Sequence, residues 1–121
     1  MVKAPLPPRA PSKRARAYSR QTREAALLLG QMIRAARIER AMSVKELGER
    51  IGASRDLMQR IEQGDLRVGL GVAFEAATVV GVPLFAAEPS RLARERAHLQ
   101  EKLSLLPKAV HTRASEVKDA F

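Results

Sequence analysis

The segment from Ser43 to Gly64 constrains the fold of this chain more than any other, because it encodes two short helices separated by a tight turn. Ser43 can cap a first helix, and Glu46, three residues later, completes a capping box. Ser54 can cap a second helix, and Gly64 supplies a left-handed residue that ends it. The turn between the helices is Ile51-Gly52-Ala53-Ser54. The pattern therefore predicts a helix, a turn and a second helix.

Apolar side chains recur at helical spacing in both helices and would close them on a shared core. These residues are Leu47, Ile51, Met58 and Ile61. The outward face of the second helix consists of Arg55, Asp56, Gln59 and Arg60. Such a pair is a helix-turn-helix, whose second helix fits the major groove, where each base pair presents a distinct set of donors and acceptors. The alternative is an ordinary helical hairpin, but the caps, the small turn residues and the basic outer face together favour DNA reading.

Further helices are expected around this motif. A first helix should run from about Thr22 to Arg40. Its inward stripe consists of Leu29, Met32, Ile33 and Ala36, and its other face carries Arg34 and Arg37. Another helix should follow a loop at residues 65–69, begin at Leu70 and end near Gly81. The run Val82-Pro83-Leu84-Phe85 is read as a turn or short helix.

A new unit starts at Pro89, where Ser90 can cap a helix that continues to Leu106 before Pro107 ends the pattern. One face of this helix carries Leu92, Leu99, Leu103 and Leu106. Its neighbours are charged, so the helix needs one apolar partner, either its own domain or another chain. The terminal ring of Phe121 is either a docking anchor or part of an unstructured end.

The composition narrows the classes of protein to which this chain could belong. A chain of 121 residues holds one domain plus tails. It has no cysteine, and His98 and His111 lie in no cluster with ligand spacing, so we expect neither metal nor cofactor. No run is apolar enough to span a membrane and no signal-peptide core follows the basic N-terminus, which predicts a soluble cytoplasmic protein. We expect no enzyme, because no catalytic constellation occurs at usable spacing.

The net charge of +9 is concentrated near the N-terminus. Residues 1–23 contain basic residues and no acid, whereas residues 24–88 contain about as many acids as bases. A basic arm beside a nearly neutral reading domain suggests phosphate tracking or minor-groove insertion, and a solubilising tail is the alternative. We therefore divide the chain into a basic flexible arm at 1–21, a helix-turn-helix domain at 22–88, and a C-terminal helix and tail at 89–121.

Residues from about Leu28 to Leu84 resemble the Xre/Cro family of helix-turn-helix proteins. The most specific part is Ser54-Arg55-x-x-Met58-x-Arg60-Ile61-Glu62-x-Gly64, which is similar to the family's recognition helix and its Glu-x-Gly ending. The resemblance implies an all-α, lambda-repressor-like bundle of four to five helices, with a C-terminal helix and flexible tails. Two positions depart from the family: Val44 replaces the usual Gln that touches phosphate, and Gly48 replaces the usual Ala.

The C-terminal half resembles HipB-like antitoxins, which accompany HipA-type kinases. The similarity lies in residues 68–75, 80–85 and 105–108 and in the closing acidic-aromatic tail, which here has less acid before Phe121. The resemblance implies the antitoxin of a type II toxin-antitoxin pair that binds a HipA-like kinase and autoregulates its operon. A stand-alone Xre-family repressor without a toxin is the alternative.

We thus expect a homodimeric repressor whose two recognition helices enter successive major grooves, about 34 Å apart on an inverted repeat. The expected base-reading residues are Arg55, Gln59, Arg60 and Asp56. An arginine can pair with guanine through two hydrogen bonds, and a glutamine can pair with adenine. For Asp56, a role in complementing the helix dipole is favoured over a hydrogen bond from cytosine. Contacts with the DNA backbone or minor groove are expected from Ser43, Lys45, Ser54, Arg67, Arg14, Arg16 and Arg20. Contacts with a partner or a second copy are expected from Leu92, Leu99, Leu103, Leu106 and Phe121.

Overall fold

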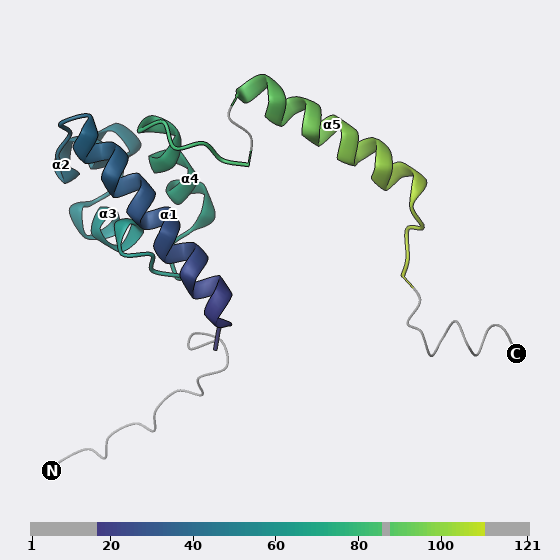
Figure 1. Cartoon of the computed structure of the whole chain (residues 1–121), viewed down its shortest axis with the longest axis horizontal. Helices are drawn as coiled ribbons and strands as arrows, with labels where there is room; N and C mark the ends of the chain where they lie inside the picture. The colour runs from purple at the N-terminus through teal and green to yellow at the C-terminus, as the bar shows by residue number, and fades with distance from the viewer. Residues whose placement is uncertain (1–16, 86–87, 111–121) are drawn as a thin grey trace, which may run out of the picture. The chain divides into compact units, whose positions relative to one another are not determined.

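The computed structural model describes residues 17–85 and 88–110, which contain five α-helices and no β-strand. They are α1 (Arg20–Glu39), α2 (Val44–Ile51), α3 (Arg55–Glu62), α4 (Leu70–Val79) and α5 (Pro89–Leu105). The chain divides into two units, Met1–Val82 and Pro83–Phe121, so α1 to α4 belong to the first and α5 to the second (Figure 1). The predicted all-helical fold is confirmed. None of the described helices is long and apolar enough to cross a membrane.

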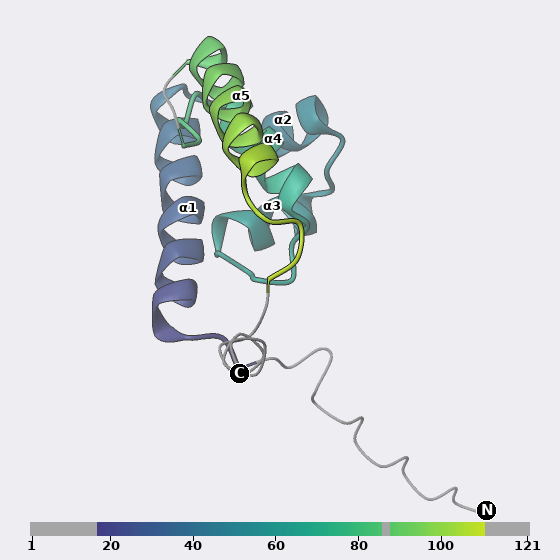
Figure 2. The same ribbon diagram turned by 90° about the vertical axis from the view of Figure 1, so that its right-hand side faces the viewer.

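The four helices of the first unit meet in a small core. α1 and α2 each contact both α3 and α4, and Figure 2 shows the length of α1 standing beside the other three. The buried apolar residues are Ile33, Met42, Leu47, Met58, Ile61, Ala76, Ala77, Val80 and Val82. Fully burying one large aliphatic side chain contributes about 1.5–3 kcal/mol, so the few large members of this set carry much of the stability.

Local hydrogen bonds fix the ends of the two motif helices as the sequence predicts. The Ser43 hydroxyl accepts a hydrogen bond from the Glu46 N–H at 3.0 Å, and the Glu46 carboxylate accepts one from the Ser43 N–H at 3.2 Å. Ser54 caps α3 in the same way, at 3.1 Å. Gly64 follows α3 with a φ of 72° and Gly52 follows α2 with a φ of 71°, a region that glycine adopts readily. The predicted capping box and turn are confirmed.

Some helix ends differ from the prediction. α1 begins two residues before Thr22, because the Ser19 hydroxyl accepts a hydrogen bond from the Thr22 N–H at 3.2 Å and caps the helix there. α5 begins at Pro89 with Glu88 in the N-cap position, so Ser90 lies inside the first turn instead of capping it. Proline suits this first position, where its missing N–H has no partner within the helix. Residues 82–85 contain no helix.

α1 also faces the core differently from the prediction. Ile33 is fully buried as expected, but Met32 is 38% exposed. The buried positions beside Ile33 are Gly30 and Arg37, and the prediction that Arg37 lies on the outer face is wrong. The reason is a polar partner on α3, which the apolar pattern of α1 cannot reveal.

Gly30 marks the closest approach of α1 to α3. A Cβ atom added to Gly30 would lie 2.6 Å from the carbonyl oxygen of Glu62 and 2.7 Å from that of Ile61. Both atoms belong to the backbone, so they cannot move aside unless α3 shifts. Glycine costs a helix about 1 kcal/mol relative to alanine, and here the helix spacing requires it.

We predict that Gly30→Ala lowers the free energy of unfolding by about 1–3 kcal/mol, because the strain exceeds the gain in helix propensity. Gly71→Ala is the matched control: Gly71 lies on α4 with no atom within 4 Å of the added Cβ, so this variant should be slightly more stable than the parent. Urea denaturation followed by circular dichroism measures both. A Gly30→Ala protein as stable as the parent would contradict the close packing of α1 on α3.

Candidate nucleic-acid interface

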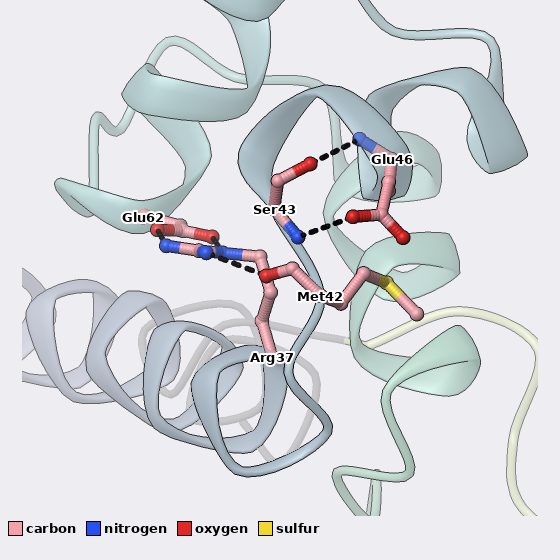
Figure 3. A network of polar contacts seen from close by, with 5 residues as sticks. All are labelled: Arg37, Met42, Ser43, Glu46 and Glu62. Carbon is pink, nitrogen blue, oxygen red and sulfur yellow. Dashed lines mark hydrogen bonds and ion pairs between the residues drawn. The ribbon is translucent and has the colours of Figure 1, made fainter.

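A buried ion pair joins the end of α1 to the end of α3. Arg37 Nε lies 2.6 Å from Glu62 Oε2, and Arg37 Nη2 lies 2.9 Å from Glu62 Oε1, so the two groups pair through two parallel hydrogen bonds (Figure 3). The side chains are only 10% and 8% exposed. Hydrogen bonding to Glu62 raises the pKa of Arg37 above its usual value, although burial opposes the rise. The two groups thus satisfy each other's hydrogen-bonding capacity through a paired, charge-assisted contact.

The connection from α1 to α2 wraps around the same arginine. Arg37 Nη1 donates a third hydrogen bond to the Met42 carbonyl oxygen at 2.9 Å, and the Met42 N–H donates to the Arg37 carbonyl oxygen at 3.0 Å. Ala41 turns the chain with a φ of 53°, and Ser43 then begins the cap of α2. One side chain thus ties together α1, the start of α2 and the end of α3, which fixes the orientation of α3.

The outer face of α3 carries two polar side chains that have no partner among the described residues. Arg55 and Gln59 are exposed and make no side-chain hydrogen bond or ion pair within that part of the chain. They are four residues apart, so they lie on the same side of the helix, one turn from each other. A helix with its side chains is about 10–12 Å in diameter, which fits the major groove, about 12 Å wide.

The other two predicted base readers are paired with each other. Arg60 Nε lies 3.2 Å from Asp56 Oδ2, one helical turn away, without the alignment of a hydrogen bond. The Arg60 side chain is 40% exposed and that of Asp56 79%. The positive charge of Arg60 also helps to lower the pKa of Asp65, so the arginine lies near two carboxylates. Arg60 is therefore less available to DNA than Arg55.

The loop after α3 is ordered by Asp65 and Arg67. The Asp65 carboxylate accepts hydrogen bonds from the Arg67 N–H at 2.9 Å, from Nε at 3.1 Å and from Nη2 at 3.0 Å. These bonds, the side-chain ones first, lower the pKa of Asp65 from 3.8 to about 2. The contribution of this carboxylate to stability is thus complete above pH 3.8 and is lost as the pH falls through about 2. Arg67 remains 74% exposed, but Asp65 balances its charge.

The remaining predicted DNA-backbone contacts lie at helix starts. Ser43 and Lys45 lie at the start of α2 and Ser54 at the start of α3, and all three are exposed. The exposed N–H groups and dipole of a helix start favour a phosphate, although both serine hydroxyls already serve as caps. Arg20 is the exposed first residue of α1. Two further predicted arm contacts, Arg14 and Arg16, lie outside the described residues.

The predicted partner residues belong to the second unit. No residue of α5 is buried. Leu92 is half-buried, whereas Leu99, Leu103 and Leu106 are 55%, 65% and 47% exposed. Leu106 is the C-cap, one residue beyond the helix, and Phe121 lies outside the described residues. Leu92, Leu99 and Leu103 therefore share a helix as predicted, whereas Leu106 adopts an extended backbone just past its end. Leu99 and Leu103 are largely open to solvent.

In the part of the chain that the structure describes, no group of three or more His, Asp or Glu side chains is arranged to hold a metal ion.

A family model for the helix-turn-helix domain matches residues 28–88, half of the chain. The chain therefore belongs to the helix-turn-helix domain family, and it is a DNA-binding regulator of that class. The matched residues include the last part of α1 and all of α2, α3 and α4. No curated protein and no solved structure matches the chain.

We predict that Arg37→Ala lowers the free energy of unfolding by about 3–5 kcal/mol, because it leaves the Glu62 carboxylate buried without a partner. Arg67→Ala, which also removes an arginine from an ion pair but at an exposed site, should change the stability far less. Urea denaturation of both variants gives the comparison. Equal losses would show that the Arg37 pair does not organise the fold.

Because Arg37→Ala can fail to fold, the milder Glu62→Gln serves as a second test. It keeps the shape and some of the hydrogen bonds but removes the negative charge, so it should lie between the parent and Arg37→Ala in stability. A Glu62→Gln protein more stable than the parent would mean that the charged pair lowers the free energy of unfolding relative to a neutral partner for Arg37.

Proposed function

We propose that this chain is a transcriptional repressor that binds an inverted-repeat operator as a homodimer, with α3 of each copy in the major groove. The observation that carries the proposal is the pair of exposed side chains, Arg55 and Gln59, one turn apart on a helix held by a buried ion pair. Polar side chains that extend from a fixed helix and have no partner within the described residues are suited to reading base edges.

The roles within α3 follow from the partners of each side chain. Arg55 is assigned to guanine, through bidentate hydrogen bonds to O6 and N7, and Gln59 to adenine. Arg60 has to leave Asp56 before it can reach a base, so it is a secondary reader. Asp56 lies in the first turn of α3, where a negative charge complements the helix dipole, and its role is to orient Arg60 and stabilise that turn.

Contacts to the sugar-phosphate backbone complete the proposed interface. The starts of α2 and α3 bring Ser43, Lys45 and Ser54 to phosphates, and Arg67 supplies a weaker contact because Asp65 competes for it. Arg14 and Arg16 of the arm, and Arg20 at the start of α1, are assigned to phosphates or the minor groove. The proposal gives the chain no enzymatic step and no cofactor.

We also propose a HipA-like kinase as protein partner, which would make the chain an autoregulating antitoxin. The support is the sequence resemblance at residues 68–75 and 80–85 and the closing Phe121. A stand-alone repressor is the alternative. A HipA-like kinase encoded beside this chain and retained by it through purification would favour the antitoxin, and a lone gene with no such partner would favour the stand-alone repressor.

We predict that Arg55→Ala weakens binding to a selected operator by about 5- to 150-fold, equivalent to about 1–3 kcal/mol, and that Gln59→Ala acts in the same range. The operator is obtained by selecting random duplexes with the purified full chain. Arg34→Ala is the matched control, because it removes the same charge from an exposed position on α1. Fluorescence anisotropy measures affinity, and the base-reading role fails if Arg55→Ala and Arg34→Ala bind alike.

We predict that deletion of residues 1–20 flattens the salt dependence of DNA binding while most of the sequence preference remains. Each phosphate contact contributes about 0.9 to the slope of log affinity against log salt concentration, so the loss of several contacts is measurable. A triple variant with Arg14, Arg16 and Arg20 changed to Gln separates the charge of the arm from its length. An unchanged slope in both proteins would exclude the arm from the interface.

A further inference from the structure

The leucine stripe of α5 has the spacing of a coiled-coil seam. Leu92, Leu99 and Leu106 recur every seven residues, and Arg96 and Leu103 fill the intermediate positions, so the steps alternate between four and three residues. α5 is a continuous helix over this stripe up to Leu105, and none of its residues is buried. A seam of this kind is covered by a second helix with the same spacing.

Arg96 decides the direction in which a second α5 can lie. In a parallel pair each seam residue meets its own copy, so Arg96 would face Arg96 of the second copy in the apolar layer, where two like charges repel and lose water. In an antiparallel pair with flush helix ends, Leu92 faces Leu103 of the second copy and Arg96 faces Leu99. The Arg96 stem then covers apolar surface while its guanidinium reaches water past small or neutral neighbours, Ala93 and Gln100.

The charges beside the seam favour the same direction. Glu95 and Lys102 flank the stripe on one side, each one residue before a seam position. In the antiparallel pair with flush ends, Glu95 faces Lys102 of the second copy and, by symmetry, Lys102 faces Glu95. In a parallel pair Glu95 would instead approach the neutral Gln100 of the second copy. Two attractive pairs thus form in one arrangement and none in the other.

We infer that α5 is a self-association surface on which two copies of this chain pair antiparallel, with Leu92 against Leu103, Arg96 against Leu99 and Glu95 against Lys102. The inference deepens the proposed function, on which it rests for the homodimer. A pair of 17-residue helices buries few leucines, so the association is weak and depends on concentration. Two adjacent half-sites on DNA raise the effective concentration of the two copies and so promote pairing.

A charge swap tests the facing pairs. Glu95→Lys and Lys102→Glu, each alone, put two like-charged pairs beside the seam and should raise the dimer dissociation constant about five- to thirtyfold. The double variant restores both attractive pairs and should return to near the parent value. Glu95 and Lys102 of one helix lie about 10 Å apart along its axis, so the rescue has to arise between copies. Glu101→Lys, with the same charge change away from the stripe, is the control, and sedimentation equilibrium of the full chain is the measurement.

A cross-link tests the direction, because the chain has no native cysteine. A mixture of Leu92→Cys and Leu103→Cys proteins should form a disulfide-linked dimer between the two variants under mild oxidation. Leu92→Cys alone should not cross-link through the seam, since its counterpart lies at the far end of the antiparallel pair.

Three results would overturn the inference: efficient cross-linking of Leu92→Cys with itself, a double charge swap that stays as weak as its single variants, or a parent chain that is monomeric at every concentration and on the selected duplex. The proposed function is judged separately. If the chain selects a duplex but does not pair through α5, the DNA-binding role stands and this inference is wrong. If it pairs as described but selects no duplex, this inference stands and the proposed repressor role is wrong.

Discussion

The buried ion pair between Arg37 and Glu62 is the interaction on which the first unit depends. It removes two charges from water, a cost that is offset only because the arginine also donates to the Met42 carbonyl oxygen and leaves no carboxylate oxygen unpaired. Through this pair the end of α3 is fixed to α1 and to the start of α2. A recognition helix held in this way loses little conformational freedom when it binds, which favours affinity.

Around α3, the side chains range from those buried or paired within the protein to those without a partner among the described residues. Met58 and Ile61 are buried, and Glu62 is held by Arg37. Arg60 is partly exposed and tied to Asp56, whereas Arg55 and Gln59 have no partner among the described residues. The inward-facing side chains set the orientation of α3, and the outward-facing ones keep their hydrogen-bonding capacity for DNA. Different side chains of the same eight residues thus serve stability and recognition.

The local features of the fold were predictable from sequence, and the long-range ones were not. The caps at Ser43 and Ser54 and the turn at Gly64 depend on neighbours within a few residues. The Arg37 pair joins positions 25 residues apart, and apolar periodicity assigns a charged residue to the surface. A signal did exist, since Arg37 follows the buried Ile33 by four residues and Glu62 follows the buried Met58 by four. Burial in one chain does not reveal what covers the α5 stripe, because a surface buried between copies is exposed in a single copy. The inference of a second copy rests instead on the seven-residue spacing and the flanking charges.

The most direct test of the central claim, that α3 reads bases through Arg55 in the major groove, is methylation interference on the selected duplex. Methylation of guanine N7 should block the parent chain in two half-sites about one helical turn apart. Binding of Arg55→Ala should become insensitive to methylation at one guanine in each half-site and stay sensitive at the others. The reason is that methylation cannot disrupt the contact that the substitution has already removed. Identical interference patterns for the parent and Arg55→Ala, or interference confined to the minor groove, would contradict the account.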